Sequence, residues 1–413
     1  MKNTSGTQNK IKQALKNWSV VSILMTSALS IGAASISHAQ QAKKPNLYVM
    51  FAFDGSYSLP MWQETREFAK QMTANGKPVK FTYFINSVYY LASKYKVKYD
   101  APNSGAGRSA IGFGGEVDEV RKRYTQTNYA AQEGHEIANH AAGHFDGSKW
   151  SYENWKSEFR QFFDMMFDKF LLNNATTYSN EFPNGWVFKK SDMVGFRAPQ
   201  LGLNNAMYTV LSESKAKYDT SKSAAPNYWP KKSAQGIWNF PLAEIPVYGT
   251  SRKTLSMDYN FYYVQSKGNP DPSRSAEYEE QTYKSYMNYI KSNYAGNRAP
   301  INIGHHFSQW NAGAYWRAMK RVVNEVCGMP EVKCVTYVEF MNVMEKMNPQ
   351  NLQLLQAQSD WQTDVHQANA GLGEDVVHNA SVGGQAGNEF KFDVTKDYFM
   401  NDPAEAHDEH LQK

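Results

Sequence analysis

Once its first 39 residues are set aside, this sequence has almost no net charge. The full chain of 413 residues has 44 Lys and Arg against 39 Asp and Glu, a formal charge of +5. Residues 1–39 contain four lysines and no acidic residue, which leaves 40 basic and 39 acidic residues in the remaining 374. A nucleic-acid-binding domain would show an excess of clustered basic residues. The near-neutral remainder therefore argues against nucleic acid as a partner.

Long apolar runs are also missing, except near the N-terminus. There the four lysines precede an uncharged stretch, 18–36, and Ser37-His38-Ala39 places small residues where a signal peptidase cleaves. Hydroxyl residues and a glycine dilute this stretch, so it is a poor membrane anchor. We expect residues 1–39 to be a secretory signal peptide, with export to the periplasm or the extracellular space. No later stretch approaches about 18 apolar residues, which predicts no stable membrane insertion after cleavage.

Cysteine is nearly absent. Cys327 and Cys334 are the two cysteines of the chain, and seven positions separate them. Two thiols alone rarely hold a structural zinc ion. Because an exported protein enters an oxidising compartment, we expect a local disulfide between them, with two free buried thiols as the alternative.

What the sequence does contain is an alternation of short apolar runs and helix-period segments. The expected strands are 47–53, 79–85, 135–139, 193–197, 301–305 and 332–336. The expected helices are 61–75, 116–133, 151–172, 204–215, 314–327 and 337–347. Such alternation predicts an α/β fold around a parallel sheet, either open or closed into a barrel.

Two segments interrupt this alternation. Residues 92–114 are rich in Lys, Tyr and Gly and are expected to be an insertion after the second strand. Residues 348–413 contain 11 acidic and 3 basic residues, whereas residues 40–347 contain 28 acidic and 37 basic ones. We therefore expect three parts: a signal peptide (1–39), a basic folded domain (40–347) and an acidic C-terminal extension (348–413).

Polar residues follow several of the expected strands. His140 and His144 are four residues apart just after the strand 135–139, a spacing that brings two imidazoles together in a turn. Asp54 ends the first strand, and active sites of parallel α/β folds lie at the C-terminal ends of strands. These three side chains form a candidate divalent-metal site. A structural role for the histidine pair remains the alternative.

In their order along the chain, these residues resemble a known family, the polysaccharide deacetylases with NodB homology, which form carbohydrate esterase family 4. The resemblance extends from about residue 45 to 347. It rests on Phe53-Asp54-Gly55, Glu133-Gly134-His135-Glu136-Ile137, His140-x-x-x-His144, Phe196-Arg197-Ala198-Pro199, Tyr218-Asp219-Thr220-Ser221 and a late strand ending in His305-His306. The segment Asn297-Arg298-Ala299-Pro300 is similar to the chitin deacetylases.

The resemblance implies a distorted (β/α) barrel and a set of site residues. His140 and His144 match the two metal-binding histidines, and Arg197 matches the arginine that holds the catalytic carboxylate. The implied metal is zinc, with cobalt or nickel as alternatives. His306 matches the late histidine that acts as general acid on the leaving amine. The backbone N–H of Gln200, after Pro199, matches the donor to the oxyanion.

The first motif departs from the family, which has two successive aspartates before the glycine. Here Phe53 and Asp54 occupy this place. Either Asp54 is the metal ligand and Phe53 replaces the base, which we favour, or Asp54 is the base and Gly55 replaces the ligand. Glu64 and Asp146 are candidates for a replacement base.

Aromatic faces suit sugar rings, so Trp229 and Trp310 are candidate substrate contacts, together with Pro199, Gln200 and His305. The favoured function is a secreted metal-dependent deacetylase that removes N-acetyl groups from a glycan, either chitin oligomers or peptidoglycan. Its partner is therefore an acetylated polysaccharide or oligosaccharide. The single carboxylate supports an alternative, a catalytically impaired glycan-binding homologue. An esterase for O-acetyl groups of polysaccharides is the third hypothesis.

Overall fold

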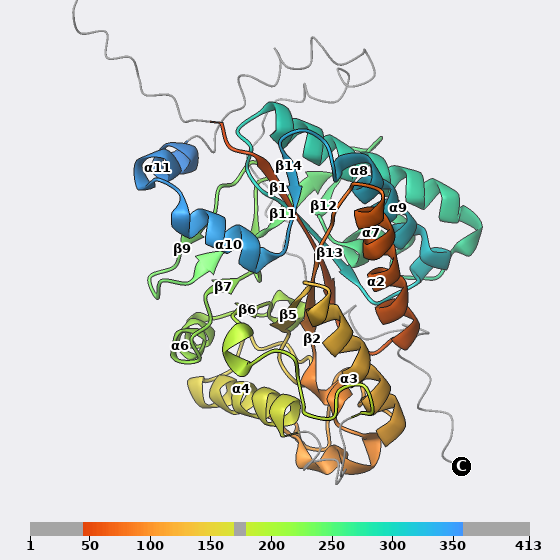
Figure 1. The fold of residues 1–413 in the computed structure, drawn as a ribbon, viewed down its shortest axis with the longest axis vertical. Helices are drawn as coiled ribbons and strands as arrows, with labels where there is room; N and C mark the ends of the chain where they lie inside the picture. The colour runs from red at the N-terminus through yellow and green to blue at the C-terminus, as the bar shows by residue number, and fades with distance from the viewer. Residues whose placement is uncertain (1–43, 169–178, 358–413) are drawn as a thin grey trace, which may run out of the picture. The chain divides into compact units, whose positions relative to one another are not determined.

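The structure of this protein is a computed structural model that describes residues 44–168 and 179–357. Strands and helices alternate through most of these ranges (Figure 1). The main strands are β1 (Leu47–Asp54), β2 (Phe81–Ile85), β5 (Glu136–Asn139), β6 (Gly195–Phe196), β7 (Tyr218–Asp219), β9 (Lys231–Lys232), β10 (Trp238–Asn239), β13 (Ile301–His306) and β14 (Val332–Cys334). The helices are α2 (Leu59–Ala74), α3 (Val117–Gln132), α4 (Tyr152–Phe167), α6 (Asn205–Glu213), α7 (Asp258–Ser266), α8 (Ser275–Ala295), α9 (Trp310–Val326), α10 (Tyr337–Lys346) and α11 (Pro349–Ala357).

The main sheet is almost entirely parallel. Its nine strands follow the order β13-β1-β2-β5-β6-β7-β10-β9, with β14 also paired to β1. All neighbouring strands are parallel except β9 and β10. Among the described residues, the end strands β13 and β9 do not pair with each other, so the curled sheet stays open. The predicted α/β fold, a distorted (β/α) barrel, is confirmed.

The predicted elements and the observed ones agree where the periodicity is strong. Each of the six predicted strands and six predicted helices overlaps an observed one, with ends that differ by a few residues. The last four residues of the predicted helix 151–172 lie outside the described ranges. The region between residues 220 and 300 was not assigned from the sequence. It contains β8 (Ser223–Ala224), β11 (Leu242–Pro246) and β12 (Lys253–Leu255), which form a separate small sheet, and helices α7 and α8.

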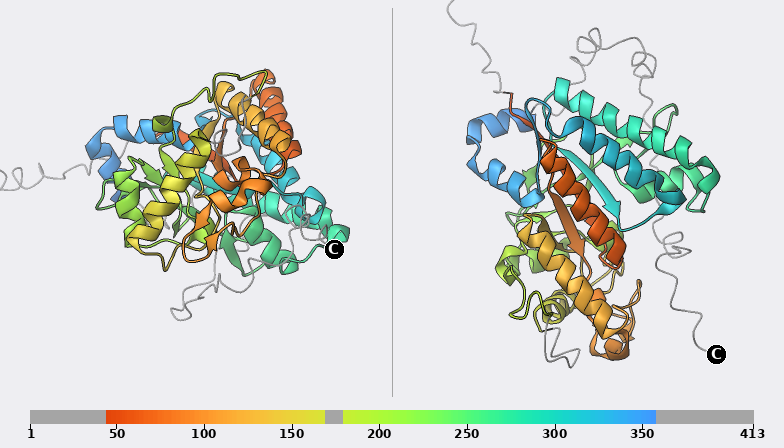
Figure 2. Two further views of the ribbon diagram at one scale, coloured as in Figure 1. Left: turned by 90° about the horizontal axis from the view of Figure 1, so that it is seen from below. Right: turned by 45° about the vertical axis from the view of Figure 1, so that its right-hand side comes forward.

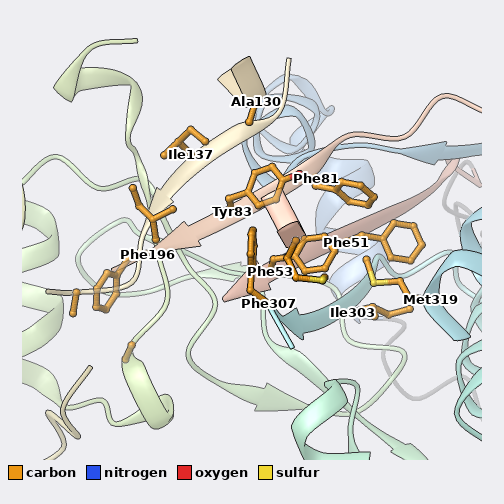
Figure 3. Packing of buried hydrophobic residues seen from close by; sticks show 14 of the residues in the cluster. Phe51, Phe53, Phe81, Tyr83, Ala130, Ile137, Phe196, Ile303, Phe307 and Met319 are labelled. Atoms are coloured by element: carbon orange, nitrogen blue, oxygen red, sulfur yellow. The ribbon is translucent and has the colours of Figure 1, made fainter. Parts of the chain in front are cut away.

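The end of β1 presents two different faces. The ring of Phe53 lies among other buried rings: its centroid is 5.2 Å from that of Phe81, 5.7 Å from that of Tyr83 and 5.5 Å from that of Trp316 on α9. Figure 3 shows Phe53 beside Phe81 and Tyr83. Because successive side chains of a strand point to opposite faces, Asp54 faces away from this core. Phe53 is therefore a core residue, and Asp54 is the side chain that the strand turns toward the other face.

The expected insertion has short elements of its own. It contains a 3-10 helix, Ser93–Lys98, and a small hairpin of β3 (Asp100–Ala101) with β4 (Gly105–Ala106). The Ala110 N–H donates to the carbonyl of Gly143 at 2.9 Å, and the Ser109 hydroxyl donates to the same oxygen at 3.3 Å. The insertion therefore packs on the loop that connects His140 and His144.

The ends of the chain lie partly outside the description. The predicted signal peptide and residues 358–413 of the acidic extension are outside the described residues. The first part of the extension forms α11, where Leu355 is buried and the Gln356 amide donates to the carbonyl of Pro230 at 2.6 Å. In the described ranges, no helix is both long and apolar enough to cross a membrane.

Two pairs of neighbouring helices flank the main sheet. Helices α2 and α3 lie beside each other along β1 and β2, and α8 packs along α9 (Figure 2). A disulfide joins Cys327, directly after α9, to Cys334 in β14, with Cα atoms 5.7 Å apart. This bond fixes the return of the chain to the start of β1, at the opposite end of the sheet from Asp54.

Candidate active site

The register of the parallel strands brings four strand ends to one edge of the sheet. Asp54 at the end of β1 pairs with His306 at the end of β13 and with Phe84 in β2. On the other side, Asn139 at the end of β5, directly before His140, pairs with Phe196 of β6. Because paired residues of parallel strands point to the same face, Asp54 and His306 project to the same side.

A buried ion pair holds the carboxylate of Asp54. The Arg197 guanidinium donates from Nη1 to Asp54 Oδ1 at 2.6 Å, and both side chains are buried. Arg197 also donates to the hydroxyls of Thr220, at 2.7 Å, and Tyr337, at 3.1 Å. These bonds fix the guanidinium, so Asp54 is held in one orientation by a charge-assisted hydrogen bond.

The loop from His140 to His144 has an unusual backbone conformation. Ala141 and His144 have positive φ angles of 58° and 61°, a region that non-glycine residues rarely adopt. Hydrogen bonds hold the loop from several sides: Ala141 N donates to Asn139 Oδ1 at 2.7 Å, and Asn86 Nδ2 donates to the His140 carbonyl at 2.6 Å. The surrounding side chains therefore determine a conformation that the loop would not adopt by itself.

Glu158 of α4 is a further buried anchor of this loop. One of its carboxylate oxygens accepts the N–H groups of Ala142, at 2.8 Å, and Gly143, at 2.9 Å. The other oxygen accepts the hydroxyl of Tyr99, in the insertion, at 2.7 Å. Glu158 has no exposed surface, and thus connects α4, the insertion and the histidine loop. The sequence pattern gives no sign of this role, because Glu158 is one of several polar residues on the predicted helix 151–172.

The two imidazoles are uncharged and one has a defined tautomer. Burial is the main reason that the pKa of His140 falls to about 3 and that the pKa of His144 lies well below its usual value. The charge of His306 lowers both further, which places it within electrostatic reach of the pair. His140 Nδ1 lies 2.8 Å from the Arg197 carbonyl, which only accepts, so Nδ1 carries the proton and Nε2 has the free lone pair.

The three predicted metal ligands lie near one another without forming a three-ligand site. His140 Nε2 is 3.9 Å from Asp54 Oδ2, and the ring centroids of His140 and His144 are 5.0 Å apart. Arg197 holds the other oxygen of Asp54. Across the two described ranges, no group of three or more His, Cys, Asp or Glu side chains is placed to hold a metal ion. The neutral imidazoles fit a divalent metal, whereas the arrangement of the carboxylate does not.

The late histidine has a carboxylate partner that sequence reasoning missed. His306 Nδ1 lies 2.7 Å from Asp258 Oδ1, and the His306 N–H donates to Asp258 Oδ2 at 2.8 Å. Burial alone would raise the pKa of Asp258, but the charges of His306 and His305 and the bonds from His306 lower it. Asp258 is therefore an anion that orients His306. It is the first residue of α7, a helix that the sequence pattern did not reveal.

Gln200 occupies a tight turn after β6. Gln200 and Leu201 have φ angles of 54° and 55°, and the Gln200 side chain donates to the His144 carbonyl at 3.3 Å. Within the described part of the chain, the backbone N–H of Gln200 has no hydrogen-bond acceptor, although the residue is buried. The role of this N–H as the donor to an oxyanion stays a prediction.

The predicted aromatic contacts divide into two classes. Trp310 is half-buried, and its ring centroid lies 5.2 Å from that of His306. Trp229 has no exposed surface and its indole N–H donates to the Asn297 carbonyl at 3.0 Å. His305 is 1% exposed and packs beside Phe53 and the Tyr286 hydroxyl. Trp229 and His305 are thus wrong as substrate contacts, because the core covers them, while Trp310 borders the site.

A left-handed turn positions Trp310. The next three residues, 311–313, have φ angles of 49°, 54° and 77°. Asn311 is buried, accepts the Asp271 N–H at 2.7 Å and donates to the Tyr315 hydroxyl at 2.9 Å. These bonds stabilise a conformation that costs non-glycine residues about 1–2 kcal/mol each. The indole consequently stands between His306 and the ring of Tyr262, on which it stacks at 5.2 Å.

The two candidate replacement bases lie in different places. Glu64 accepts the Trp316 indole N–H at 2.6 Å and the Lys320 ammonium at 3.0 Å, so it belongs to the packing of α2 on α9. Asp146 binds Ser148 and lies against Gly202, two residues after Gln200. Of the two, Asp146 is the one near the histidine loop.

No protein-family model matches the sequence, and the comparison with curated proteins found no match. Several solved structures are similar. A candidate polysaccharide deacetylase from Mycobacterium smegmatis has 14% identity and a TM-score of 0.44, over 74% of this chain and 93% of the other. A family 4 carbohydrate esterase from Streptomyces lividans has 10% identity and a TM-score of 0.36, over 70% and 92%. A family 4 pseudoenzyme from Bacillus anthracis has 9% identity and a TM-score of 0.38, over 72% of this chain and 66% of the other. These structures are ones to which the chain is similar, and their names agree with the resemblance seen in the sequence.

Proposed function

We propose that this chain hydrolyses acetyl groups of an acetylated glycan, with N-acetyl groups as the favoured substrate. One observation carries the proposal. The hydrogen-bonded pair of Asp258 and His306 faces the same strand edge as the ion pair of Asp54 and Arg197 and the two neutral imidazoles. A proton donor and a carboxylate acceptor at one edge are what acyl-group hydrolysis needs.

Each group has a chemical role in this proposal. Asp54 removes a proton from a water molecule, which adds to the acetyl carbonyl. The negative charge that develops on the carbonyl oxygen is stabilised by the N–H of Gln200. The C–N bond then breaks as His306 donates a proton to the leaving amine, and acetate is released. Asp258 holds the imidazole of His306 so that Nε2 faces the substrate.

The position of Arg197 supports the base role for Asp54. In the resemblance, this arginine holds the catalytic carboxylate, and here its partner is Asp54. This favours the alternative in which Gly55 stands where the family has a metal ligand. It weakens the preference for Asp54 as ligand that the motif alone suggested.

Metal dependence is a separate part of the proposal. His140 and His144 would hold a divalent ion, zinc or else cobalt or nickel. Such an ion would polarise the acetyl carbonyl and lower the pKa of a bound water. We expect zinc content to depend on both histidines: a His140→Ala, His144→Ala double variant should lose it. Equal zinc content in wild type and the double variant would contradict this ligand set.

Export is also proposed, on the lysines and apolar stretch of residues 1–39. It is supported by the disulfide between Cys327 and Cys334, since such bonds persist in oxidising compartments. The site would then meet its substrate in the periplasm or outside the cell.

A second candidate function has its own observation. Phe53 leaves one carboxylate on β1 where the family has two, and its ring is part of the core. This supports a glycan-binding protein with impaired catalysis.

Acetate release distinguishes these functions. The purified protein is treated with a chelator, supplied with Zn²⁺ or Co²⁺, and incubated with N-acetylglucosamine oligomers, with peptidoglycan and with an O-acetylated polysaccharide. Release from the first two supports the deacetylase, and release from the third alone supports the esterase. Absence of acetate in all three, together with measurable glycan binding, would replace the proposed enzyme with the binding protein.

A further inference from the structure

The segment 93–108 of the insertion forms a wall beside the histidine loop. Its contact with that loop runs through Ser109 and Ala110, which both donate to the Gly143 carbonyl. Tyr99 reaches beneath the loop to Glu158. Tyr99 and the two residues that directly follow the wall thus attach it to the loop that carries His140 and His144.

The wall carries positive charge. Lys94, Lys96, Lys98 and Arg108 are all exposed, and the only acidic residue in the segment is Asp100. Among the ion pairs of the described ranges, none involves Lys94, Lys96 or Arg108. This contrasts with Lys232, Lys284, Arg274 and Arg321, which each pair with a carboxylate. The positive charges of Lys94, Lys96 and Arg108 are therefore not neutralised by ion pairs within the described ranges.

Backbone contacts make the wall a fixed element. Ser93 N donates to the Gly115 carbonyl at 2.8 Å, and Gly107 N donates to the Tyr99 carbonyl at 2.8 Å. A Cβ added at Gly107 would lie 3.5 Å from the side chain of Lys96, so the 3-10 helix Ser93–Lys98 contacts the residue that follows β4. Charges on a fixed surface next to a site attract an oppositely charged ligand over about a Debye length, roughly 8–10 Å.

We propose that this basic wall, residues 93–108, makes the site selective for acetylated glycans that carry carboxylate groups. The inference rests on the proposed function, since it names the substrate class of the same site. A neutral chitin oligomer gains nothing from these charges. A glycan with a carboxylate on every second sugar gains attraction in the encounter and contacts in the complex. The +9 excess of residues 40–347 has the same sign as the wall.

The test compares two oligosaccharides of equal length. One is an N-acetylglucosamine oligomer, and the other alternates N-acetylglucosamine with N-acetylmuramic acid, whose lactyl group adds a carboxylate. We expect calorimetry at low salt to show severalfold tighter binding of the carboxylated oligomer. The advantage should shrink as NaCl is raised, because salt screens exposed charges.

Two double variants locate the effect. Lys94→Ser, Lys96→Ser should weaken binding of the carboxylated oligomer about fivefold and leave the neutral one unchanged. The control is Lys291→Ser, Lys333→Ser. Both control residues are exposed, and Lys333 lies on β14 beside the start of β1, at the opposite end of the sheet. Circular dichroism checks that both variants fold.

The outcomes separate this inference from the function beneath it. Equal affinity for the two oligomers, or an equal loss in the control variant, would overturn the selectivity. Acetate release is measured in parallel: its absence, with the binding preference intact, would remove the catalytic function and leave the recognition of carboxylated glycans standing.

Discussion

The two sides of the candidate site differ in how completely they are built. On the β13 side, His306 is bonded twice to a buried aspartate, once through its ring and once through its backbone. On the β1 side, one carboxylate, Asp54, is bound by Arg197, and the neighbouring position is the core residue Phe53.

This difference separates proton donation from water activation. The β13 side has an oriented imidazole and needs no further group to act as an acid. The β1 side has one carboxylate for two family roles, the base and the metal ligand. The chemistry of the site is therefore limited by β1, and changes on the two sides should have different consequences.

The largest effect is expected on the β13 side. His306→Gln should reduce acetate release about a hundredfold or more, because the leaving amine loses its proton donor. Asp258→Asn should reduce acetate release less than His306→Gln does. It should also shift the pH dependence of acetate release, because the variant lacks the anion that favours a protonated His306. Acetate release measured from pH 5 to pH 9 distinguishes the two. If Asp258→Asn leaves the profile unchanged, Asp258 only supports the fold.

On the β1 side, adding a carboxylate should have opposite results at two adjacent positions. Phe53→Asp should lower the free energy of unfolding by about 4 kcal/mol, because a charge replaces a ring packed against Phe81, Tyr83 and Trp316. Gly55→Asp should fold, because a Cβ at Gly55 has no heavy atom within 4 Å. Its φ of 78° costs an aspartate about 1 kcal/mol. Thermal unfolding measures both.

Zinc binding distinguishes further between the two positions, 53 and 55. Gly55→Asp should bind zinc more tightly than wild type, and Gly55→Asn is the matched control, with the same backbone cost and no charge. Equal zinc affinity of the two variants would show that position 55 is not where the ligand is missing. A well-folded Phe53→Asp with raised acetate release would contradict the placement of Phe53 in the core.

How much of this was predictable follows from the range of each interaction. β1 and α4 were found because a continuous apolar run and a wide apolar stripe are local patterns. The strand ends with Asp54, His140, Arg197 and His306 were found because chain order and parallel pairing suffice to bring them to one edge.

The rest depends on contacts between distant segments. Asp258 lies 48 residues before its partner His306, in a region of two- to five-residue strands that leave no periodic signal. The sequence predicts Trp229 as a substrate contact because it lies in a loop-like segment. Its hydrogen bond to the carbonyl of Asn297, 68 residues away, is a tertiary contact that the sequence pattern does not reveal. Glu158 is a similar case, since the N–H groups that donate to it are oriented by a loop with positive φ angles.

A buried acid in β5, Glu136, is connected through two tyrosines to Arg197, the partner of Asp54. Glu136 accepts the Tyr218 hydroxyl at 2.7 Å, and Tyr218 stacks on Tyr337, which accepts a bond from Arg197. Burial raises the pKa of Glu136 to about 7, against the lowering effect of its hydrogen bonds. Between about pH 4.5 and pH 7, the unfolded chain loses this proton while the folded chain keeps it. Stability should therefore fall as pH rises through this window, by roughly 3 kcal/mol from this group.

The Glu136→Gln variant isolates that contribution. The amide keeps the size and hydrogen-bonding capacity of the protonated acid and does not titrate. Chemical unfolding at pH 4.5 and pH 8 should show that the variant gains on wild type as pH rises. A difference between the two proteins that stays constant with pH would mean that Glu136 is ionised in the folded state without cost.

The smallest effect concerns the acidic extension. Residues 358–413 contain 11 acidic and 3 basic residues, and their charge is opposite to that of the basic wall. If this charge competes with an anionic glycan, a chain that stops after Ala357 should bind the carboxylated oligomer a few fold more tightly at low salt and equally at high salt. Stopping there preserves α11 and its bond from Gln356 to Pro230. The neutral oligomer is the control, because its binding should not change. Truncation in the Lys94→Ser, Lys96→Ser background should give a smaller gain, since the charges for which the extension and the glycan compete are reduced; an undiminished gain would place the competition on another surface.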